Sequence, residues 1–254
     1  MKISILVPTY NESKNIGNLL AGLKDAANQS TGAEFDVIVL DDSSPDGTAD
    51  LARQIGATLC GSDGASTNYR VHVWIRAQKE GLGKAYIWGF KKLLNQTEVP
   101  DYILQMDADL SHDPKYIKNF VESAGKGADF VTATRYVDGG GTPDWPWYRK
   151  LLSRGGNFYA RSILGRQITD YTGGFNMYKT TLLKKIDFDG LFSAGYGFLI
   201  DLKFQSSKAA LKIAEVPIVF HDRQHGYSKM PARTIFDSCL LVLKIKVRNL
   251  LQKN

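Results

Sequence analysis

Short apolar runs alternate with longer segments of helical periodicity along the first part of the chain. The apolar runs, each of strand length, are residues 3–7, 35–40, 71–76 and 102–106. The segments with apolar side chains at three- and four-residue spacing are residues 13–27, 47–54 and 82–94. Largely apolar strands that alternate with helices favour a mostly parallel sheet that is covered by helices on both faces.

The pattern changes at residues 138–143, a glycine-rich connection that leads into an aromatic and basic helix near Trp145. Beyond it, we predict strands at 172–178 and 213–220, with a helix at 198–210 between them. The chain has 254 residues, of which 43% are apolar, and it contains no long linker. It is therefore expected to build one main domain around a single large core.

The C-terminal segment, residues 234–252, has apolar residues at helical spacing together with several lysines and arginines. A basic amphipathic helix of this kind can lie on an anionic membrane, although it more often packs against its own domain. We therefore divide the chain into a main domain at 1–233 and a helical element at 234–254. Both placements of the helix stay open at this point.

Charge and cysteine content narrow the setting. The balance of 32 basic and 26 acidic residues gives +6, which favours anionic partners such as nucleotides, nucleic acid or an acidic membrane surface. The two cysteines, Cys60 and Cys239, lie far apart and suggest neither a disulfide framework nor a zinc site, so a reducing compartment fits best. The first residues are too short for a secretory signal, and no apolar run approaches the length of a membrane span.

Two carboxylates, Asp107 and Asp109, follow the apolar run at 102–106. Side chains two residues apart in an extended segment point to one face, so both can reach one divalent cation at the carboxyl edge of the sheet. Open α/β sheets bind their ligands at that edge. The alternative is that Asp109 begins a turn and caps the helix that follows Asp113, with Asp107 in solvent beside it.

Three further loops are expected to converge on the same edge. They are residues 7–12, 41–48 and 81–85. The last of them is no phosphate loop, because the GxxxxGK[ST] spacing is absent, and Tyr86 stands where GxGxxG has its final glycine. A metal that bridges the two carboxylates to a diphosphate is the remaining way to hold the phosphates of a nucleotide here.

Two sets of motifs carry a resemblance to a known family. The first set is residues 8–12, 41–48, 81–83 and 107–112, and the second is Arg135-Tyr136, 145–150, 153–155 and 223–229. The first set resembles the inverting family 2 glycosyltransferases. With the second set, nearly the whole chain resembles the polyprenyl-phosphate (dolichol-phosphate) mannose synthases. The resemblance implies an α/β fold of the GT-A type (nucleotide-diphospho-sugar transferase, Rossmann-like), with a predominantly parallel mixed sheet flanked by helices, for the catalytic domain at 1–233.

The resemblance also implies roles for particular residues. The nucleoside of the donor would be held by Pro8, Tyr10, Glu12 and Asp42. Asp107 and Asp109 would bind Mg²⁺ or Mn²⁺ and, through it, the diphosphate, with Ser111 at a third ligand position where the family often has glutamine. The phosphate of the acceptor lipid would be held by Arg135, Arg149, Ser153, Arg223 and Lys229. Asp170 and Asp201 are weaker candidates for contacting the sugar or the acceptor, and a helix-surface or capping role is an equal alternative for both.

The reaction that follows from this resemblance is transfer of mannose from GDP-mannose to a polyprenyl or dolichyl phosphate, with inversion at the anomeric carbon. A phosphate acceptor is already ionised near neutral pH, so positioning and charge neutralisation matter more than a strong general base. The implied setting is cytoplasmic, peripheral on the cytosolic face of a membrane, and some family members use a separate membrane-anchoring subunit. The alternatives are a UDP-glucose-dependent glucosyltransferase and a non-catalytic nucleotide-sugar-binding protein; no nucleic-acid partner is expected.

Overall fold

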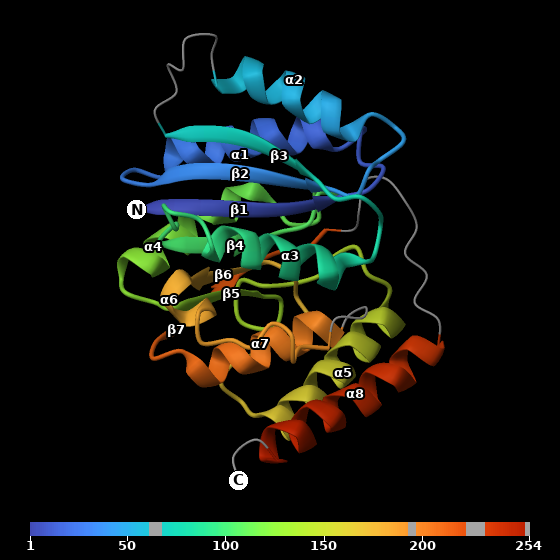
Figure 1. Cartoon of the computed structure of the whole chain (residues 1–254). Coiled ribbons are helices and arrows are strands. Elements are labelled where there is room, and N and C mark those ends of the chain that lie inside the picture. The colour runs from blue at the N-terminus through green and yellow to red at the C-terminus, as the bar shows by residue number, and fades with distance from the viewer. Residues whose placement is uncertain (61–67, 193–196, 222–231, 252–254) are drawn as a thin grey trace.

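A computed structural model describes residues 1–60, 68–192, 197–221 and 232–251 of the chain, and in these residues seven strands form one sheet (Figure 1). The strand order is β3-β2-β1-β4-β6-β5-β7. The strands are β1 (Lys2–Thr9), β2 (Glu34–Asp41), β3 (Tyr69–Ile75), β4 (Tyr102–Gln105), β5 (Phe130–Thr134), β6 (Asn176–Lys179) and β7 (Ile213–Pro217). β6 runs antiparallel to β4 and β5, whereas the other neighbouring pairs are parallel. The predominantly parallel mixed sheet is therefore confirmed.

Helices cover both faces of the sheet and create two apolar cores (Figure 1). The helices are α1 (Ile16–Gln29), α2 (Thr48–Cys60), α3 (Leu82–Leu94), the 3-10 turn η1 (Pro114–Tyr116), α4 (Ile117–Gly125), α5 (Trp147–Leu164), α6 (Thr180–Leu183), α7 (Gly197–Ala209) and α8 (Ala232–Leu251). α1, α2 and α4 contribute to one core, and α3, α5, α6, α7 and α8 contribute to the other. Gly89 lets α3 approach the sheet, because a Cβ there would lie 2.8 Å from Leu40 Cδ1.

Three predicted elements have different bounds in the structure. The strand predicted at 172–178 begins only at Asn176, because the backbone N–H groups of Thr172 and Gly173 donate to the Asp170 carboxylate and form a turn. The helix predicted at 47–54 extends to Cys60. The strand at 213–220 is also shorter, since β7 ends at Pro217.

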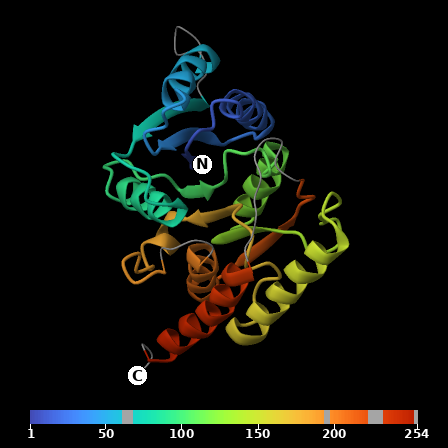
Figure 2. The same cartoon turned by 90° about the vertical axis from the view of Figure 1, so that its right-hand side faces the viewer.

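The C-terminal helix α8 packs against its own domain, beside α5 and α7 (Figure 2). Val242 and Ile245 are buried in the second core. Arg248 of α8 forms an ion pair of 2.5 Å with Asp201 of α7. The packed placement is therefore what the structure shows, while a boundary between residues 233 and 234 stays a prediction. No helix in the described ranges combines the length and apolar character that a membrane crossing requires.

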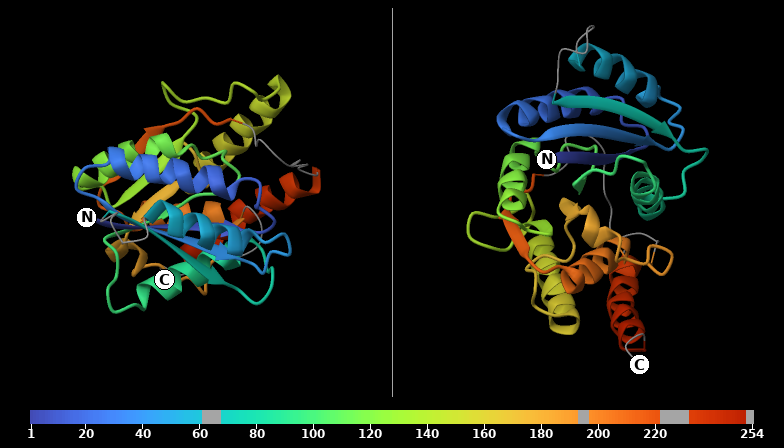
Figure 3. Two further views of the ribbon diagram at one scale, coloured as in Figure 1. Left: turned by 90° about the horizontal axis from the view of Figure 1, so that it is seen from above. Right: turned by 60° about the vertical axis from the view of Figure 1, so that its left-hand side comes forward.

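The N-terminal elements and the two long helices α5 and α8 lie at opposite ends of the molecule (Figure 3). Between them, the carboxyl ends of β1, β2, β4 and β5 lead into the loops that carry most of the predicted site residues. This edge is where a ligand of an open α/β sheet is expected.

Candidate active site

Asp41, the last residue of β2, shapes the loop that follows it. Its carboxylate accepts hydrogen bonds from Thr9 Oγ1 at 2.9 Å and from the backbone N–H of Ser44 at 2.8 Å. Ser43, which precedes Ser44 in this loop, has φ +53°, in the left-handed region. Asp41 therefore has a structural role, and it fixes the loop that carries the neighbouring Asp42.

Asp42 forms a buried ion pair with Arg76, the residue after β3. Arg76 Nη1 donates to Asp42 Oδ1 at 2.7 Å, and Arg76 Nη2 donates to Glu80 at 2.9 Å. Burial raises the pKa of the Asp42 carboxyl, and the charge of Arg76 offsets this only in part. Because burial disfavours its charged form, the Asp42 carboxylate would be stabilised by a further hydrogen-bond donor, such as a hydroxyl or N–H group of a nucleoside.

The other predicted donor residues lie on the adjoining loop. Pro8 is in β1, and Tyr10 follows it with 36% of its surface exposed. The Nζ atom of Lys79 lies 3.8 Å from the centre of the Tyr10 ring. The backbone N–H of Glu12 donates to Thr48 Oγ1 at 3.0 Å, which ties this loop to the start of α2. The loops after β1 and β2 therefore form one continuous wall.

Asp109 sits in a tight turn rather than at a helix cap. Its Oδ1 atom accepts the backbone N–H of Ser111 at 3.0 Å and the Ser111 hydroxyl at 2.6 Å. Leu110 has φ +63°, in the left-handed region. The cap of the following turn is Asp113, whose side chain accepts a backbone N–H two residues further on. The capping alternative for Asp109 is therefore wrong.

Asp107 lies half-buried at the edge of the same turn. Its backbone N–H donates to His112 Nδ1 at 2.9 Å, and the Tyr86 hydroxyl lies 3.4 Å from its Oδ1 atom. Gly174 faces it from the neighbouring turn: a Cβ there would lie 3.7 Å from Asp107 Oδ2 and 3.2 Å from His112 Cε1. The glycine thus keeps the approach to this carboxylate narrow but open.

The donor atoms of this turn fit a hard divalent cation. Asp107 and Asp109 offer carboxylate oxygens, which Mg²⁺ and Mn²⁺ prefer. Within the described ranges, no group of three or more histidine, cysteine, aspartate or glutamate side chains is placed to hold a metal. A pair of carboxylates suits a cation that takes its other oxygens from a diphosphate and water. The hydroxyl of Ser111, our predicted third ligand, donates to Asp109 here.

Arg135 follows β5 and is locked to Asp170. Arg135 Nε and Nη2 donate to the two oxygens of Asp170 at 2.8 Å and 3.0 Å, a bidentate arrangement. Burial alone would raise the pKa of Asp170, but the charges of Arg135 and Lys203 outweigh it and hold the pKa well below its usual range. Asp170 is completely buried, so it is no helix-surface residue. It holds Arg135 and the turn that carries Gly174 in place.

Lys203 completes this buried charge cluster from α7. The side chain has no exposed surface, and its Nζ atom donates to the Gly173 carbonyl at 3.3 Å. Burial lowers the pKa of Lys203 to about 8, although the charge of Asp170 acts in the opposite direction. The Asp170 network therefore joins β5, α7 and the turn beside Asp107.

Two of the predicted acceptor residues, Arg149 and Ser153, lie one turn apart on α5. The guanidinium carbon of Arg149 lies 4.0 Å from the centre of the buried Trp145 ring. The hydroxyls of Ser153 and Tyr136 are 2.6 Å apart. Because Tyr136 is the neighbour of Arg135, the start of α5 and the end of β5 meet here. Arg135, Arg149 and Ser153 are thus brought to one region.

The structure does not describe two of the predicted acceptor residues, and it places a third candidate, Asp201, away from this region. Arg223 and Lys229 lie outside the described residues. Asp201 is completely buried, and its carboxylate pairs with Arg248 and accepts the backbone N–H of Phe192 at 3.0 Å. Asp201 therefore serves the docking of α8 rather than a helix surface.

Sequence reasoning missed the contributions of Arg76 and Lys203. Arg76 was visible only as the end of a predicted strand, and nothing local pairs it with Asp42, 34 positions earlier. Lys203 stands in a helix whose residues are buried on nearly all sides, including Phe198 and Phe204. The usable signal was a lysine inside the apolar run at 198–204, because a lysine in such a run is buried and needs a partner.

Comparison with known proteins places the chain among glycosyltransferases. The family model described as Glycosyl transferase family 2 matches residues 4–187. A relative named undecaprenyl-phosphate mannosyltransferase, from Micrococcus luteus, is 38% identical over 96% of this chain and 93% of its own length. Another, named polyprenol monophosphomannose synthase, from Mycolicibacterium smegmatis, is 36% identical over 98% of this chain and 88% of its own length.

Solved structures support the same fold. The structure of glucosyl-3-phosphoglycerate synthase from Mycobacterium tuberculosis with Mn²⁺, UDP and glucosyl-3-phosphoglycerate has a TM-score of 0.59 at 20% identity, covering 96% of this chain and 78% of that one. Its complex with UDP alone has a TM-score of 0.61 at 19% identity, covering 96% and 79%. At this identity the likeness shows the GT-A fold alone. With the family match and the two relatives, it leads to one conclusion: the chain belongs to glycosyl transferase family 2.

Proposed function

We propose that this chain transfers mannose from GDP-mannose to a polyprenyl phosphate such as dolichyl phosphate, and that it depends on Mg²⁺ or Mn²⁺. One observation carries the proposal. A carboxylate pair, Asp107 and Asp109, and a guanidinium locked in place, Arg135, are joined across the turn that contains Gly174. The names of the two relatives, undecaprenyl-phosphate mannosyltransferase and polyprenol monophosphomannose synthase, support the same acceptor class.

On the donor side, the residues bind and orient a nucleotide sugar. Asp42 accepts hydrogen bonds from the nucleoside, while Tyr10 and Glu12 form the wall beside it. Asp107 and Asp109 would hold the divalent cation, which would neutralise the charge that develops on the leaving diphosphate. The hydrogen bonds from Ser111 keep the Asp109 carboxylate in one orientation.

On the acceptor side, the arginines neutralise and orient the phosphate of the lipid. Arg135 and Arg149 approach from the end of β5 and from α5, and both guanidinium groups lie near the Trp145 ring. Ser153 adds a hydroxyl beside that of Tyr136. A phosphate oxygen held in this way is already ionised, so it attacks the anomeric carbon without a general base. The C–O bond to GDP breaks as the new bond forms, so the configuration at the anomeric carbon inverts.

The outer faces of α5 and α8 supply a surface where a lipid acceptor is met. Their exposed apolar side chains are Trp147, Tyr148, Leu151, Leu152 and Phe158 on α5, and Leu240, Leu243, Val247, Leu250 and Leu251 on α8. These two helices lie side by side (Figure 2). We infer that they rest on a bilayer, on its cytosolic face where GDP-mannose is available.

A variant test addresses this membrane contact. Replacing Trp147 and Leu151 together by glutamate is expected to reduce sedimentation with liposomes and use of long-chain acceptor, while binding of GDP is spared. Leu211→Glu is the matched control, because Leu211 is 92% exposed just before β7 and belongs to neither helix. If the double variant binds liposomes as the wild type does, the proposed contact of α5 with the membrane is wrong.

The function itself is tested by a donor panel. The purified chain is incubated with polyprenyl phosphate, Mg²⁺ or Mn²⁺, and radiolabelled GDP-mannose, GDP-glucose or UDP-glucose, and the label that enters organic solvent is counted. We expect label from GDP-mannose alone, and none when EDTA is present. Label from UDP-glucose instead would overturn the donor, and no lipid product with any donor would favour a nucleotide-sugar-binding protein.

A further inference from the structure

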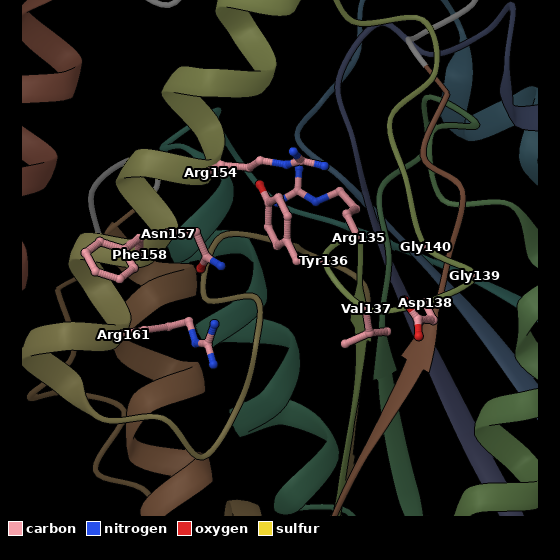
Figure 4. Close-up of a pocket in the computed structure, with 10 residues that line it drawn as sticks. All are labelled: Arg135, Tyr136, Val137, Asp138, Gly139, Gly140, Arg154, Asn157, Phe158 and Arg161. Carbon is pink, nitrogen blue, oxygen red and sulfur yellow. The ribbon is translucent and has the colours of Figure 1, made fainter.

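A cavity of about 480 Å³ lies between α5 and the loop that follows β5 (Figure 4). Arg154, Phe158 and Arg161 line it from α5, while Arg135 and Asp138 line it from the loop. None of the functional assignments above uses Arg154 or Arg161. The cavity therefore has no role in the proposed reaction.

The positive charge of this cavity is poorly balanced. Arg135 is already neutralised by Asp170, and among the described residues neither Arg154 nor Arg161 has an ion pair. The Nε atom of Arg161 is buried and has no hydrogen-bond partner in this part of the chain. A buried guanidinium N–H without an acceptor is costly, because its hydration is lost without replacement. Asp138 supplies one carboxylate on the opposite wall, so an excess of positive charge remains.

Two of the arginines converge beside Tyr136. The Arg135 guanidinium carbon lies 5.3 Å from the centre of the Tyr136 ring, and the charges of Arg135 and Arg154 both act to lower the pKa of the Tyr136 hydroxyl, against the larger effect of burial. Figure 4 shows the side chain of Arg154 extending toward that of Arg135 above this ring. Arg135 already has Asp170 as its partner, so an anion that enters here would balance the charge of Arg154.

The cavity faces a different side of α5 from the predicted acceptor residues. Arg149 and Ser153 are four positions apart, so they lie on one side of the helix. Arg154, Phe158 and Arg161 are spaced by four and three positions, so they lie together on another side of it. Phe158 is 68% exposed at the rim of the cavity. It continues the exposed apolar surface of α5, so the chain of a lipid whose phosphate enters the cavity would lie along that surface.

We propose that this cavity is a second phosphate site, in which Arg154 binds a phosphate carried by a lipid and Arg161 adds positive charge to the cavity wall. The Arg154 guanidinium supplies charge-assisted hydrogen bonds to the phosphate oxygens. Arg135 lines this cavity and is also the predicted acceptor ligand, so an occupied second site lies directly beside the reaction. The proposal concerns binding and does not require that the transferred sugar is mannose.

Calorimetric titration of the full chain without donor tests the proposal. The probes are citronellyl phosphate, a soluble prenyl phosphate, and dihexanoyl phosphatidylglycerol, with citronellol and inorganic phosphate as controls. For at least one lipid phosphate, we expect a binding component that Arg149→Gln leaves intact and that Arg154→Gln weakens roughly tenfold or more. Combining Arg154→Gln with Arg161→Gln should remove that component, and the probe that shows it identifies the source of the phosphate.

Arg166→Gln is the matched control, because Arg166 is exposed just beyond the end of α5 and does not line the cavity. Thermal unfolding checks the double variant, and the exposed Arg154 alone keeps the test decisive if the double variant does not fold. Wild-type affinity of Arg154→Gln for both lipid phosphates would overturn the proposal, as would inorganic phosphate binding as tightly as either lipid. Failure of the donor panel with Arg154-dependent binding intact would overturn only the proposed function.

Discussion

Two ion pairs each bury an arginine beside an aspartate: Arg76–Asp42 on the proposed donor half of the edge, and Arg135–Asp170 on the proposed acceptor half. Arg76 divides its hydrogen bonds between Asp42 and Glu80, and burial still raises the pKa of Asp42. Asp170 instead receives two bonds from Arg135 as well as backbone N–H groups, and its pKa is held low despite burial.

The difference separates two uses of the same residue pair. Asp42 retains a penalty that a bound nucleoside can relieve, so it suits ligand binding. Asp170 is satisfied by the protein itself, so it suits the positioning of a neighbour that binds ligand. The stability of the fold should therefore depend on Asp170 far more than on Asp42.

Replacing Asp170 by asparagine tests this contrast with the largest expected effect. The variant leaves Arg135 buried without its charge partner, which should lower the free energy of unfolding by about 3–5 kcal/mol. Asp42→Asn is the matched control and should change it by less than about 1 kcal/mol, because burial already disfavours the Asp42 charge. Urea unfolding measures both. Equal losses would remove the distinction between the pairs.

The Arg135–Asp170 pair should also make the stability of the protein depend on pH. The folded pKa of Asp170 lies below its unfolded value of 3.8, so its contribution is present above that pH and is lost as the pH falls through the folded pKa. Asp170→Asn should therefore lose less stability than the wild type on acidification below about pH 4. Parallel pH profiles of the two proteins would contradict the assignment.

Replacing Asp109 by asparagine tests the junction between the two halves. Asparagine keeps an oxygen that accepts the hydrogen bonds of Ser111, but it removes the carboxylate charge that we propose to hold the cation. We expect transfer to fall on the order of 10²- to 10³-fold while the fold is kept. The control is Asp113→Asn at the helix cap, which should retain transfer. Full transfer by the Asp109 variant would exclude this carboxylate as a metal ligand.

Lys203 should make the stability of the protein depend on pH in the alkaline range. Burial lowers its pKa to about 8 in the fold, against the usual 10.5 of a lysine, so the unfolded chain binds more protons between these pH values. Stability should accordingly rise with pH across that window, by up to about 3 kcal/mol. Lys203→Met should remove this part of the slope in urea titrations. An unchanged slope would mean that Lys203 stays charged inside the protein.

Most of the proposed donor half can be predicted from local sequence signals. The strands β1 to β4 and the loops after them follow from local apolar runs and from turn residues such as those at 41–48. The carboxylate pair was found because it directly follows an apolar run. These signals lie within a few residues of one another, so they are visible without the fold.

The acceptor half depends on contacts between distant positions. Arg135 and Asp170 are 35 positions apart, and Asp201 pairs with Arg248 across 47 positions. No periodicity carries such pairings, because they are set by the antiparallel insertion of β6 and the docking of α8. For α8, apolar residues occur on both its buried and exposed sides, so the pattern left its two placements open.

Steady-state kinetics of Asp42→Asn and Arg149→Gln over a grid of GDP-mannose and polyprenyl phosphate concentrations test the division of the edge most directly. We predict that Asp42→Asn raises the KM for the donor roughly tenfold, about 1.4 kcal/mol, with little change in the KM for the acceptor. Arg149→Gln should show the opposite pattern. If both variants raise the same KM, or if Asp42→Asn mainly impairs the acceptor, the assignment of the two halves is contradicted.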